Sequence, residues 1–265
     1  MKQHLKRTII ACSIIAMTGI SNTIAQEGES KEPSIFPVDV KVCSFKDGMG
    51  QVDLDKWFEK FNAWMTTLAG SAPTPEGYSA WTLTPFYYGP EQDFDFIWLG
   101  TSPNAAALGR GHDSYLNVSG DLPIEFQKIA NCKAKSNFAT MNIKEPPDRD
   151  DSTEFVLSFS DCEVAEGKTF DDVEPALKAW SEYRTGHGSE AGMWVMWPAY
   201  GGGGADFDFK FAVSHPDYES WGTDYDQYAK EGYAKAEELF GGLLDCDDSR
   251  AYNAWPQIVG ISDDE

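Results

Sequence analysis

Basic residues are scarce in this chain of 265 residues. Its 21 Lys and Arg face 43 Asp and Glu, which gives a formal net charge of −22 at pH 7. A general nucleic-acid binder, or a protein of anionic membrane surfaces, needs cations that neutralise phosphates, so the composition excludes both classes. The acidic surface favours solubility, and it suits adaptation to a salty medium better than cation binding.

Histidine is rare as well, with four copies, and the common catalytic motifs are absent. The chain has no His-Glu-x-x-His zinc motif, no Cys-x-x-Cys motif and no Gly-x-Ser-x-Gly nucleophile elbow. The glycine run 201–204 is not followed by the Lys-Ser/Thr pair of a phosphate-binding loop. The sequence therefore predicts no metal site, leaves the cofactor unknown, and does not decide whether the protein is an enzyme.

The first 25 residues have the pattern of a secretory signal peptide. A basic start precedes an apolar stretch over residues 8–20, and a small-x-small site ends at Ala25. The apolar stretch is too short to span a bilayer, and no later segment approaches that length. A lipidated Cys12 is a weaker alternative, because the apolar stretch continues past it. We expect an exported, periplasmic or extracellular protein that is cleaved after Ala25 and has no membrane span.

The remaining chain contains an internal repeat. Cys43 and Cys162 lie 162 − 43 = 119 residues apart, and Cys132 and Cys246 lie 246 − 132 = 114 apart. Shared landmarks recur between them in the same order: Asp53-Leu54 with Asp172-Val173, Trp-x-x-x-Pro at 81–85 and 194–198, and Asp-Phe-Asp-Phe at 93–96 and 206–209. So many ordered matches predict two homologous repeats, 34–146 and 153–260, joined by a polar linker at 147–152.

The residue pattern within each repeat predicts the element order β-α-β-β-α-β. The first copy has a strand at 38–45, a helix at 54–68, strands at 78–85 and 93–101, a helical region after Pro103 and a last strand near 137–143. Helix N-caps are expected at Asp53 and Asn104, and at Asp172 and Asp217 in the second copy. The expected fold class is α+β, with two tandem ferredoxin-like repeats packed sheet to sheet.

Four cysteines follow the signal segment, two in each repeat. Export favours disulfides, and four cysteines allow three connectivities. The duplication selects Cys43–Cys132 and Cys162–Cys246. The topology agrees, because the first and fourth strands of a ferredoxin-like sheet are neighbours and each predicted pair lies at one end of them.

The two cysteine-bounded units, with their Trp-x-x-x-Pro and Asp-Phe-Asp-Phe strands, resemble the dimeric α/β-barrel superfamily in a tandem, single-chain form. In that superfamily two sheets pack face to face and enclose a cavity. Its members include cofactor-free monooxygenases, lactone isomerases, haem-binding chlorite dismutases and dye-decolorising peroxidases. The peroxidase motif Gly-x-x-Asp-Gly does not match, because Lys46-Asp47-Gly48 supplies only its end.

Strand periodicity selects one set of candidate site residues. Phe94, Phe96 and Trp98 share one face of the strand near 93–100, and Asp93, Asp95, Ile97 and Leu99 share the other. If the aromatic face packs on helices, Asp95 faces the barrel interior, as do Asp208 and Lys210 in the second repeat. A carboxylate there can act as a general base. The alternative is an Asp–Lys pair that satisfies itself.

Unduplicated residues supply the other candidates, because a single site need not occur twice. His112 follows Arg110 and precedes Tyr115, a grouping that can bind haem, a metal or an anionic substrate. A surface histidine at a helix start is the alternative. Tyr115 and Tyr228 recur at equivalent places, so they are candidate ligand contacts that also suit a packing role.

The sequence predicts a protein that binds a small, partly apolar or aromatic molecule in the cavity between its sheets, through Arg110, Tyr115, Lys210 and Tyr228. The alternatives are a cofactor-free oxygenase or isomerase with His112, Asp95 or Asp208 as base, and a non-catalytic protein that acts through its surface in an assembly. Oligomeric state is left open.

Overall fold

The computed structural model describes residues 35–68, 77–90, 92–147, 153–202 and 206–258. The predicted signal peptide and residues 148–152 of the predicted linker lie outside these ranges. None of the described helices is both long and apolar enough to cross a membrane.

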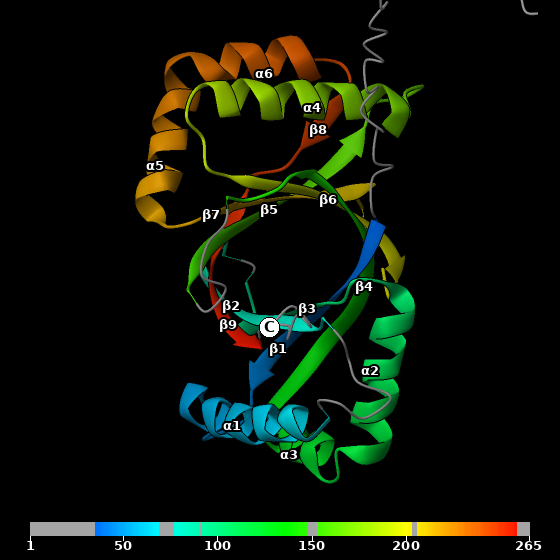
Figure 1. Ribbon diagram of the computed structural model, residues 1–265. Helices are drawn as coiled ribbons and strands as arrows, with labels where there is room; N and C mark the ends of the chain where they lie inside the picture. Colours follow the sequence, from blue (N-terminus) through cyan, green and yellow to red (C-terminus); the bar gives the residue numbers. More distant parts are fainter. Residues whose placement is uncertain (1–34, 69–76, 91, 148–152, 203–205, 259–265) are drawn as a thin grey trace, which may run out of the picture. The chain divides into compact units, whose positions relative to one another are not determined.

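Eight strands close into an antiparallel barrel (Figure 1). Their order is β7-β6-β4-β1-β3-β2-β9-β5, and pairing of β5 with β7 completes the ring. The strands are β1 (Ile35–Phe45), β2 (Ser79–Tyr87), β3 (Phe96–Thr101), β4 (Ala130–Lys144), β5 (Phe155–Val164), β6 (Gly192–Tyr200), β7 (Phe209–His215) and β9 (Arg250–Ile258). A short β8 (Leu244–Cys246) pairs with the end of β5. The prediction of an α+β protein built around a barrel is confirmed.

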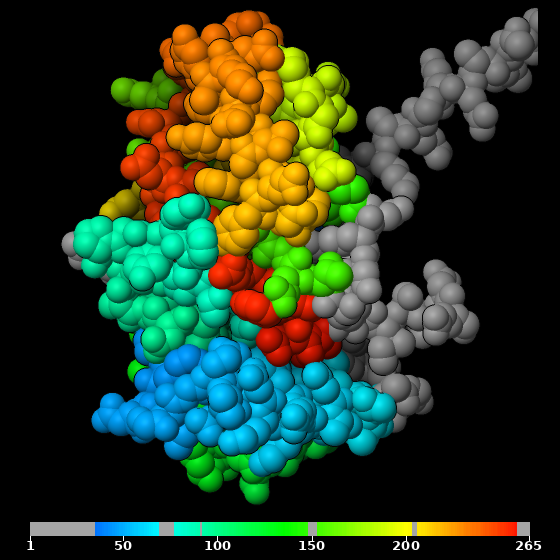
Figure 2. Space-filling model, turned by 90° about the vertical axis from the view of Figure 1, so that its left-hand side faces the viewer, coloured from blue at the N-terminus to red at the C-terminus, as the bar shows by residue number. Residues whose placement is uncertain are grey.

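Both halves of the ring have the same internal order. The first half runs β4-β1-β3-β2 and the second runs β9-β5-β7-β6. The halves join where β4 pairs with β6 and where β2 pairs with β9. The last strand of each half therefore pairs with the other half as well as its own. Close to one of these joins, the end of β2 also contacts α5 (Tyr218–Gln227) on the face shown in Figure 2, with ring centroids of Tyr87 and Trp221 5.5 Å apart.

Helices lie outside the barrel, one set against each half (Figure 1). The first half has α1 (Gln51–Leu68), α2 (Ala105–Val118) and α3 (Leu122–Ile129). The second half has α4 (Phe170–Gly186), α5, the π-helical turn η1 (Tyr228–Gly232) and α6 (Tyr233–Phe240). Helix α1 forms because Leu54, Trp57, Phe58 and Phe61 make one apolar stripe, and all four are buried against the sheet.

The helix caps divide into two cases. Asn104 and Asp217 cap α2 and α5 as predicted, because each carboxyl or amide oxygen accepts a backbone N–H three residues on. The predictions for Asp53 and Asp172 are wrong by three positions. Both helices begin earlier, and each aspartate sits in the first turn and accepts the backbone N–H of the residue that precedes the helix, which in α4 completes a capping box with Thr169.

The core has two layers, one inside the barrel and one between the sheet and the helices. Strand β3 shows both, since Ile97 and Leu99 pack inside the barrel while Phe96 and Trp98 pack against the helix side. The predicted alternation therefore holds within the strand. It fails before the strand, where Phe94 packs against the barrel-interior cluster instead of the helices.

Both predicted disulfides are present. Cys43–Cys132 joins β1 to β4, and Cys162–Cys246 joins β5 to β8. Each pair is directly opposite in its ladder. The first bridge joins the first and last strands of its half, as the sequence argument requires. The second joins β5 to the short β8 instead, because Cys246 comes before β9 begins at Arg250.

Candidate functional site

The barrel interior contains a cavity of about 550 Å³. Its walls are mainly aromatic and aliphatic, and the lining residues are Phe36, Val38, Trp81, Leu99, Thr101, Thr140, Glu145, Pro146, Pro147, Phe155, Leu157, Phe159, Trp194, Met196 and Ala212. This volume lies in the usual range for small-molecule sites, which are concave, mostly apolar and supplied with few polar groups.

One buried polar atom in this lining lacks a hydrogen-bond partner within the described part of the chain. Thr140 is 2% exposed, and its Oγ1 has none. The other lining threonine, Thr101, donates its hydroxyl to the carbonyl oxygen of Pro37. A buried hydroxyl without a partner destabilises the fold unless something satisfies it. Thr140 is therefore the buried group of this lining whose hydrogen-bonding capacity the described residues leave unused.

The cavity lining does not fit a haem. Haem iron is usually held by His, Cys, Tyr or Met, and Met196 alone among the lining residues belongs to that set. Among the described residues of the lining there is also no lysine or arginine that could meet haem carboxylates. Among the described residues, no group of three His, Cys, Asp or Glu side chains is arranged to hold a metal ion.

A second pocket lies between the first-half sheet and its helices, and it contains His112. The His112 Nε2 atom lies 2.8 Å from Oδ2 of Asp39 on β1, and the Asn137 amide donates to the other oxygen of that carboxylate at 2.7 Å. Burial alone would raise the pKa of Asp39, but the hydrogen bonds from His112 and Asn137 and the charge of Lys41 lower it below its ordinary value. The ionised Asp39 therefore fixes the imidazole through its Nε2 atom and leaves Nδ1 on the other side of the ring.

Hydrogen-bond donors line the same pocket, whose volume is about 50 Å³, room for a few water-sized groups. Lys41 Nζ lies 5.0 Å from the ring centre of Trp98, and burial lowers the pKa of this lysine. The Tyr78 hydroxyl accepts a hydrogen bond from the Trp98 indole at 3.0 Å and keeps its own proton to donate. Burial raises the pKa of Tyr78, and it raises the pKa of Tyr115 to about 12, so both phenols stay protonated at neutral pH.

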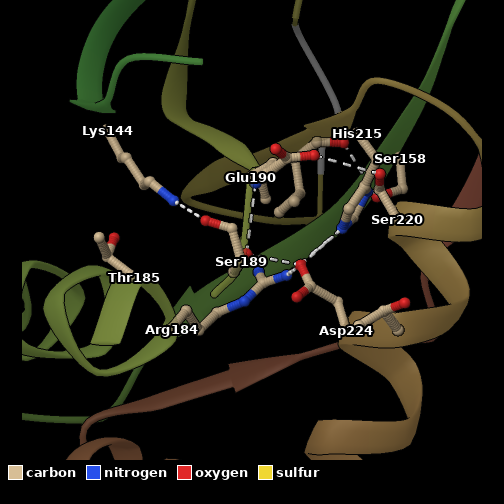
Figure 3. Close-up of polar contacts among 12 residues, drawn as sticks. Lys144, Ser158, Arg184, Thr185, Ser189, Glu190, His215, Ser220 and Asp224 are labelled. Atoms are coloured by element: carbon tan, nitrogen blue, oxygen red, sulfur yellow. Dashed lines mark hydrogen bonds and ion pairs between the residues drawn. The ribbon is translucent and has the colours of Figure 1, made fainter. Parts of the chain in front are cut away.

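The second half contains a buried ionic network that joins α4, α5 and β7 (Figure 3). Oδ2 of Asp224 accepts from Arg184, from the Ser189 hydroxyl at 2.6 Å, and lies 2.9 Å from His215 Nε2. Burial opposes ionisation, but the hydrogen bond from His215 and the charge of Arg184 lower the pKa of Asp224 to about 2. The positive charge of Arg184 is paired with the negative charge of Asp224 inside the network. We therefore infer that the network stabilises the fold.

The carboxylates predicted to face the cavity do not face it. Asp95 and Asp208 are exposed, and neither lines the cavity. Each instead accepts a backbone N–H at 2.7 Å from the strand that carries the first cysteine of its half: Phe45 for Asp95 and Val164 for Asp208. Both aspartates come before the first residue of their strand, so strand alternation does not set their direction. Their duplication reflects this shared structural contact.

The other predicted contacts are scattered. Lys210 pairs with Asp161, its neighbour across the β5–β7 ladder, and does not line the cavity. This is the self-satisfied pair that was the alternative interpretation. Arg110 is exposed on α2, and Tyr228 is 45% exposed with a ring contact to Trp180. Of the predicted ligand contacts, Tyr115 alone joins His112 in one pocket.

The sequence interpretation missed Asp39, Lys41 and Thr140. A signal for the first two was present, since Val38, Val40 and Val42 alternate with them on β1 and pack toward the barrel interior. Charged residues at the alternate positions had to face the helices, where few charges are expected. No local pattern marked Thr140, whose role depends on walls supplied by six other strands of the barrel.

Comparisons with known proteins support the fold. No protein-family model matches the chain, and no curated protein matches it. A proposed monooxygenase from Fusobacterium nucleatum subsp. nucleatum superposes with a TM-score of 0.52 at 11% identity, over 86% of this chain and 94% of that one. Two further solved structures superpose with a TM-score of 0.49. One is a proposed chlorite dismutase, at 12% identity over 83% of this chain and 94% of that one. The other is a haem-binding protein from Thermus thermophilus, at 10% identity over 83% of this chain and 91% of that one. The chain therefore has the fold of a dimeric α/β barrel, with no sequence family shown.

Proposed function

We propose that this protein binds a small, mainly apolar or aromatic molecule inside its barrel. The observation that carries the proposal is the 550 Å³ cavity with the buried, unpartnered Thr140 hydroxyl in its wall. Trp81 and Trp194, which occupy equivalent places in the two halves, both line it. A ligand with one polar atom near Thr140 and an apolar body against the aromatic walls matches this lining.

Calorimetric titration with indole and with naphthalene tests the proposal, because both are fused aromatic bicycles of similar size and only indole carries a polar N–H group. Ala212 lines the cavity and is buried, so Ala212→Leu places three further carbon atoms there. The matched control is Ala105→Leu on the exposed face of α2. We expect the wild type and the control to bind alike and Ala212→Leu to bind at least ten times more weakly.

If the probes bind inside the barrel, only the substitution in the cavity should reduce their affinity. Equal affinity of Ala212→Leu and the wild type would show that the probes bind elsewhere. If Ala212→Leu does not fold, Thr140→Val serves instead. It should reduce the affinity for indole and leave the affinity for naphthalene unchanged.

We further propose that the protein is exported and cleaved after Ala25. Two disulfides suit an oxidising compartment, and the first 25 residues have the pattern of a signal peptide. The intact mass of protein recovered outside the cytoplasm tests both points. A chain that retains residue 1, or that carries four free thiols, would contradict the proposal.

We also propose that the two halves descend from one duplicated ferredoxin-like unit. The support is their equal strand order and the matching ladder positions of the two disulfides. Sequences of relatives with only one unit would test it.

A second candidate function is proton-transfer catalysis by His112, which the 2.8 Å contact with Asp39 favours. Its test is deuterium exchange at the carbon next to the carbonyl of small ketones and lactones in D₂O, followed by NMR. His112→Gln should abolish exchange above the buffer rate. An unchanged rate in His112→Gln would remove this candidate.

A further inference from the structure

Lys41 is a positive charge held in a pocket without an ion-pair partner among the described residues. The nearest carboxylate in sequence on its strand face, Asp39, is already engaged by His112 and Asn137. Lys41 instead points its ammonium toward the Trp98 ring. In a chain with twice as many acids as bases, a partly buried lysine without an acidic partner needs a specific explanation.

A second lysine reinforces the positive potential. Lys135 stands directly opposite Lys41 in the β1–β4 ladder. Like charges at directly opposed positions destabilise a sheet, and the charge of Lys135 also lowers the pKa of Lys41. Lys135 is exposed and does not line the pocket, so it acts through its field.

Two phenols supply further hydrogen-bond donors in the pocket. Tyr78 and Tyr115 present their hydroxyls there, whereas the carboxylate of Asp39, which binds His112, is not among the lining residues. Around them stand aromatic walls from Trp57, Phe61 and Trp64. A carboxylate on a short apolar body requires hydrogen-bond donors for its oxygens and apolar walls for its carbon atoms, and this pocket supplies both.

We propose that this pocket binds a small monocarboxylate, with Lys41 as its counter-charge and the aromatic walls around its apolar part. The site is separate from the barrel cavity, because Lys41 and the cavity-lining Val38 lie on opposite faces of β1. The inference concerns the same pocket as the second candidate function, because His112 lines that pocket too. Carboxylate binding with no deuterium exchange would remove catalysis and keep the inference.

The test is calorimetric titration at low ionic strength with butyrate, its neutral analogue butyramide, and chloride. The variant is Lys41→Met, and the control is Lys56→Met, which removes an exposed lysine from α1. We expect butyrate to bind the wild type and Lys56→Met equally, and to bind Lys41→Met at least ten times more weakly. Butyramide and chloride should each bind the wild type at least ten times more weakly than butyrate.

Several results would overturn the inference. They are equal affinity for butyrate and butyramide, equal affinity for butyrate and chloride, full affinity in Lys41→Met, and no butyrate binding by the wild type. Thermal unfolding checks that the variant is folded. Without ligand, Lys41→Met should melt at or above the wild-type temperature, because it removes a desolvated charge. Butyrate should raise the melting temperature of the wild type and of Lys56→Met, but not that of Lys41→Met.

Discussion

Replacing Thr140 with valine should stabilise the ligand-free protein. The exchange puts a methyl group in place of a hydroxyl that is 2% exposed and has no partner in the described structure. An unsatisfied buried hydroxyl costs about 1–3 kcal/mol relative to a satisfied one. Since the side-chain volume hardly changes, we expect a gain of about 1 kcal/mol in the free energy of unfolding, which raises Tm by roughly 2–4 °C in a domain of this size.

Thr82 provides the matched control. It is also buried, at 1% exposure, but its Oγ1 accepts a hydrogen bond from the Gln257 amide at 2.9 Å. Thr82→Val leaves that amide without its acceptor, so it should lower the free energy of unfolding by about 1–2 kcal/mol. The two substitutions are chemically identical and should act in opposite directions.

Urea unfolding followed by tryptophan fluorescence, with scanning calorimetry for Tm, measures both variants. If Thr140→Val destabilises the protein as much as Thr82→Val does, then the Thr140 hydroxyl has a partner in the free protein. In that case it is not available to a ligand, and the reasoning that makes it the polar contact of the cavity is refuted.

Three further predictions concern stability. Removing the Cys43–Cys132 bridge by a double alanine substitution should cost about 4–5 kcal/mol by the chain-entropy model for a separation of 89 residues, as measured by urea unfolding; a cost below about 1 kcal/mol would contradict it. The folded pKa of Asp224 lies near 2, below its unfolded value, so its contribution of roughly 2 kcal/mol is present above pH 4 and is lost as the pH falls toward 2. Asp224→Asn should flatten that part of the stability–pH curve, and an unchanged curve would show that Asp224 does not cause this pH dependence. Gly201→Ala should destabilise by more than about 1 kcal/mol, because φ is +73° and a Cβ would lie 2.2 Å from a backbone oxygen, whereas Gly89→Ala, with open space around it, should be nearly neutral in the same assay.

The repeat was the most informative feature of the sequence for the fold. Two pairs of cysteines at similar spacing predicted the disulfides, and both formed because each pair is directly opposed in a ladder, β1 with β4 in the first half and β5 with β8 in the second. Helix starts were predicted less well. Asp53 and Asp172 were predicted as N-caps. An acid is also favourable three residues after the N-cap, where its side chain accepts the backbone N–H of the N-cap residue, and both aspartates occupy that position.

The candidate site was predicted only in part. His112 and Tyr115 were selected because they stand close together and His112 is unduplicated, and they do share a pocket. Asp95 and Asp208 were selected by strand alternation, and this failed because both precede the first paired residue of their strand. Alternation holds where a ladder fixes the pleat, and it says nothing of the turn that leads into it.

The sequence by itself determined the acidic character, the recurring order of landmark residues, the disulfide pairing and the alternating faces of the strands, because these depend on composition, spacing and local periodicity. Tertiary structure alone decided which side chains share a pocket. Asp39 on β1 contacts His112 on α2, which lies 112 − 39 = 73 residues further along the chain. Thr140 faces a cavity whose walls come from strands of both halves, and no described residue there bonds its hydroxyl. The first contact depends on how α2 packs on the first-half sheet, and the cavity around Thr140 depends on barrel closure, which pairs β4 with β6 and β2 with β9. No local pattern encodes either arrangement.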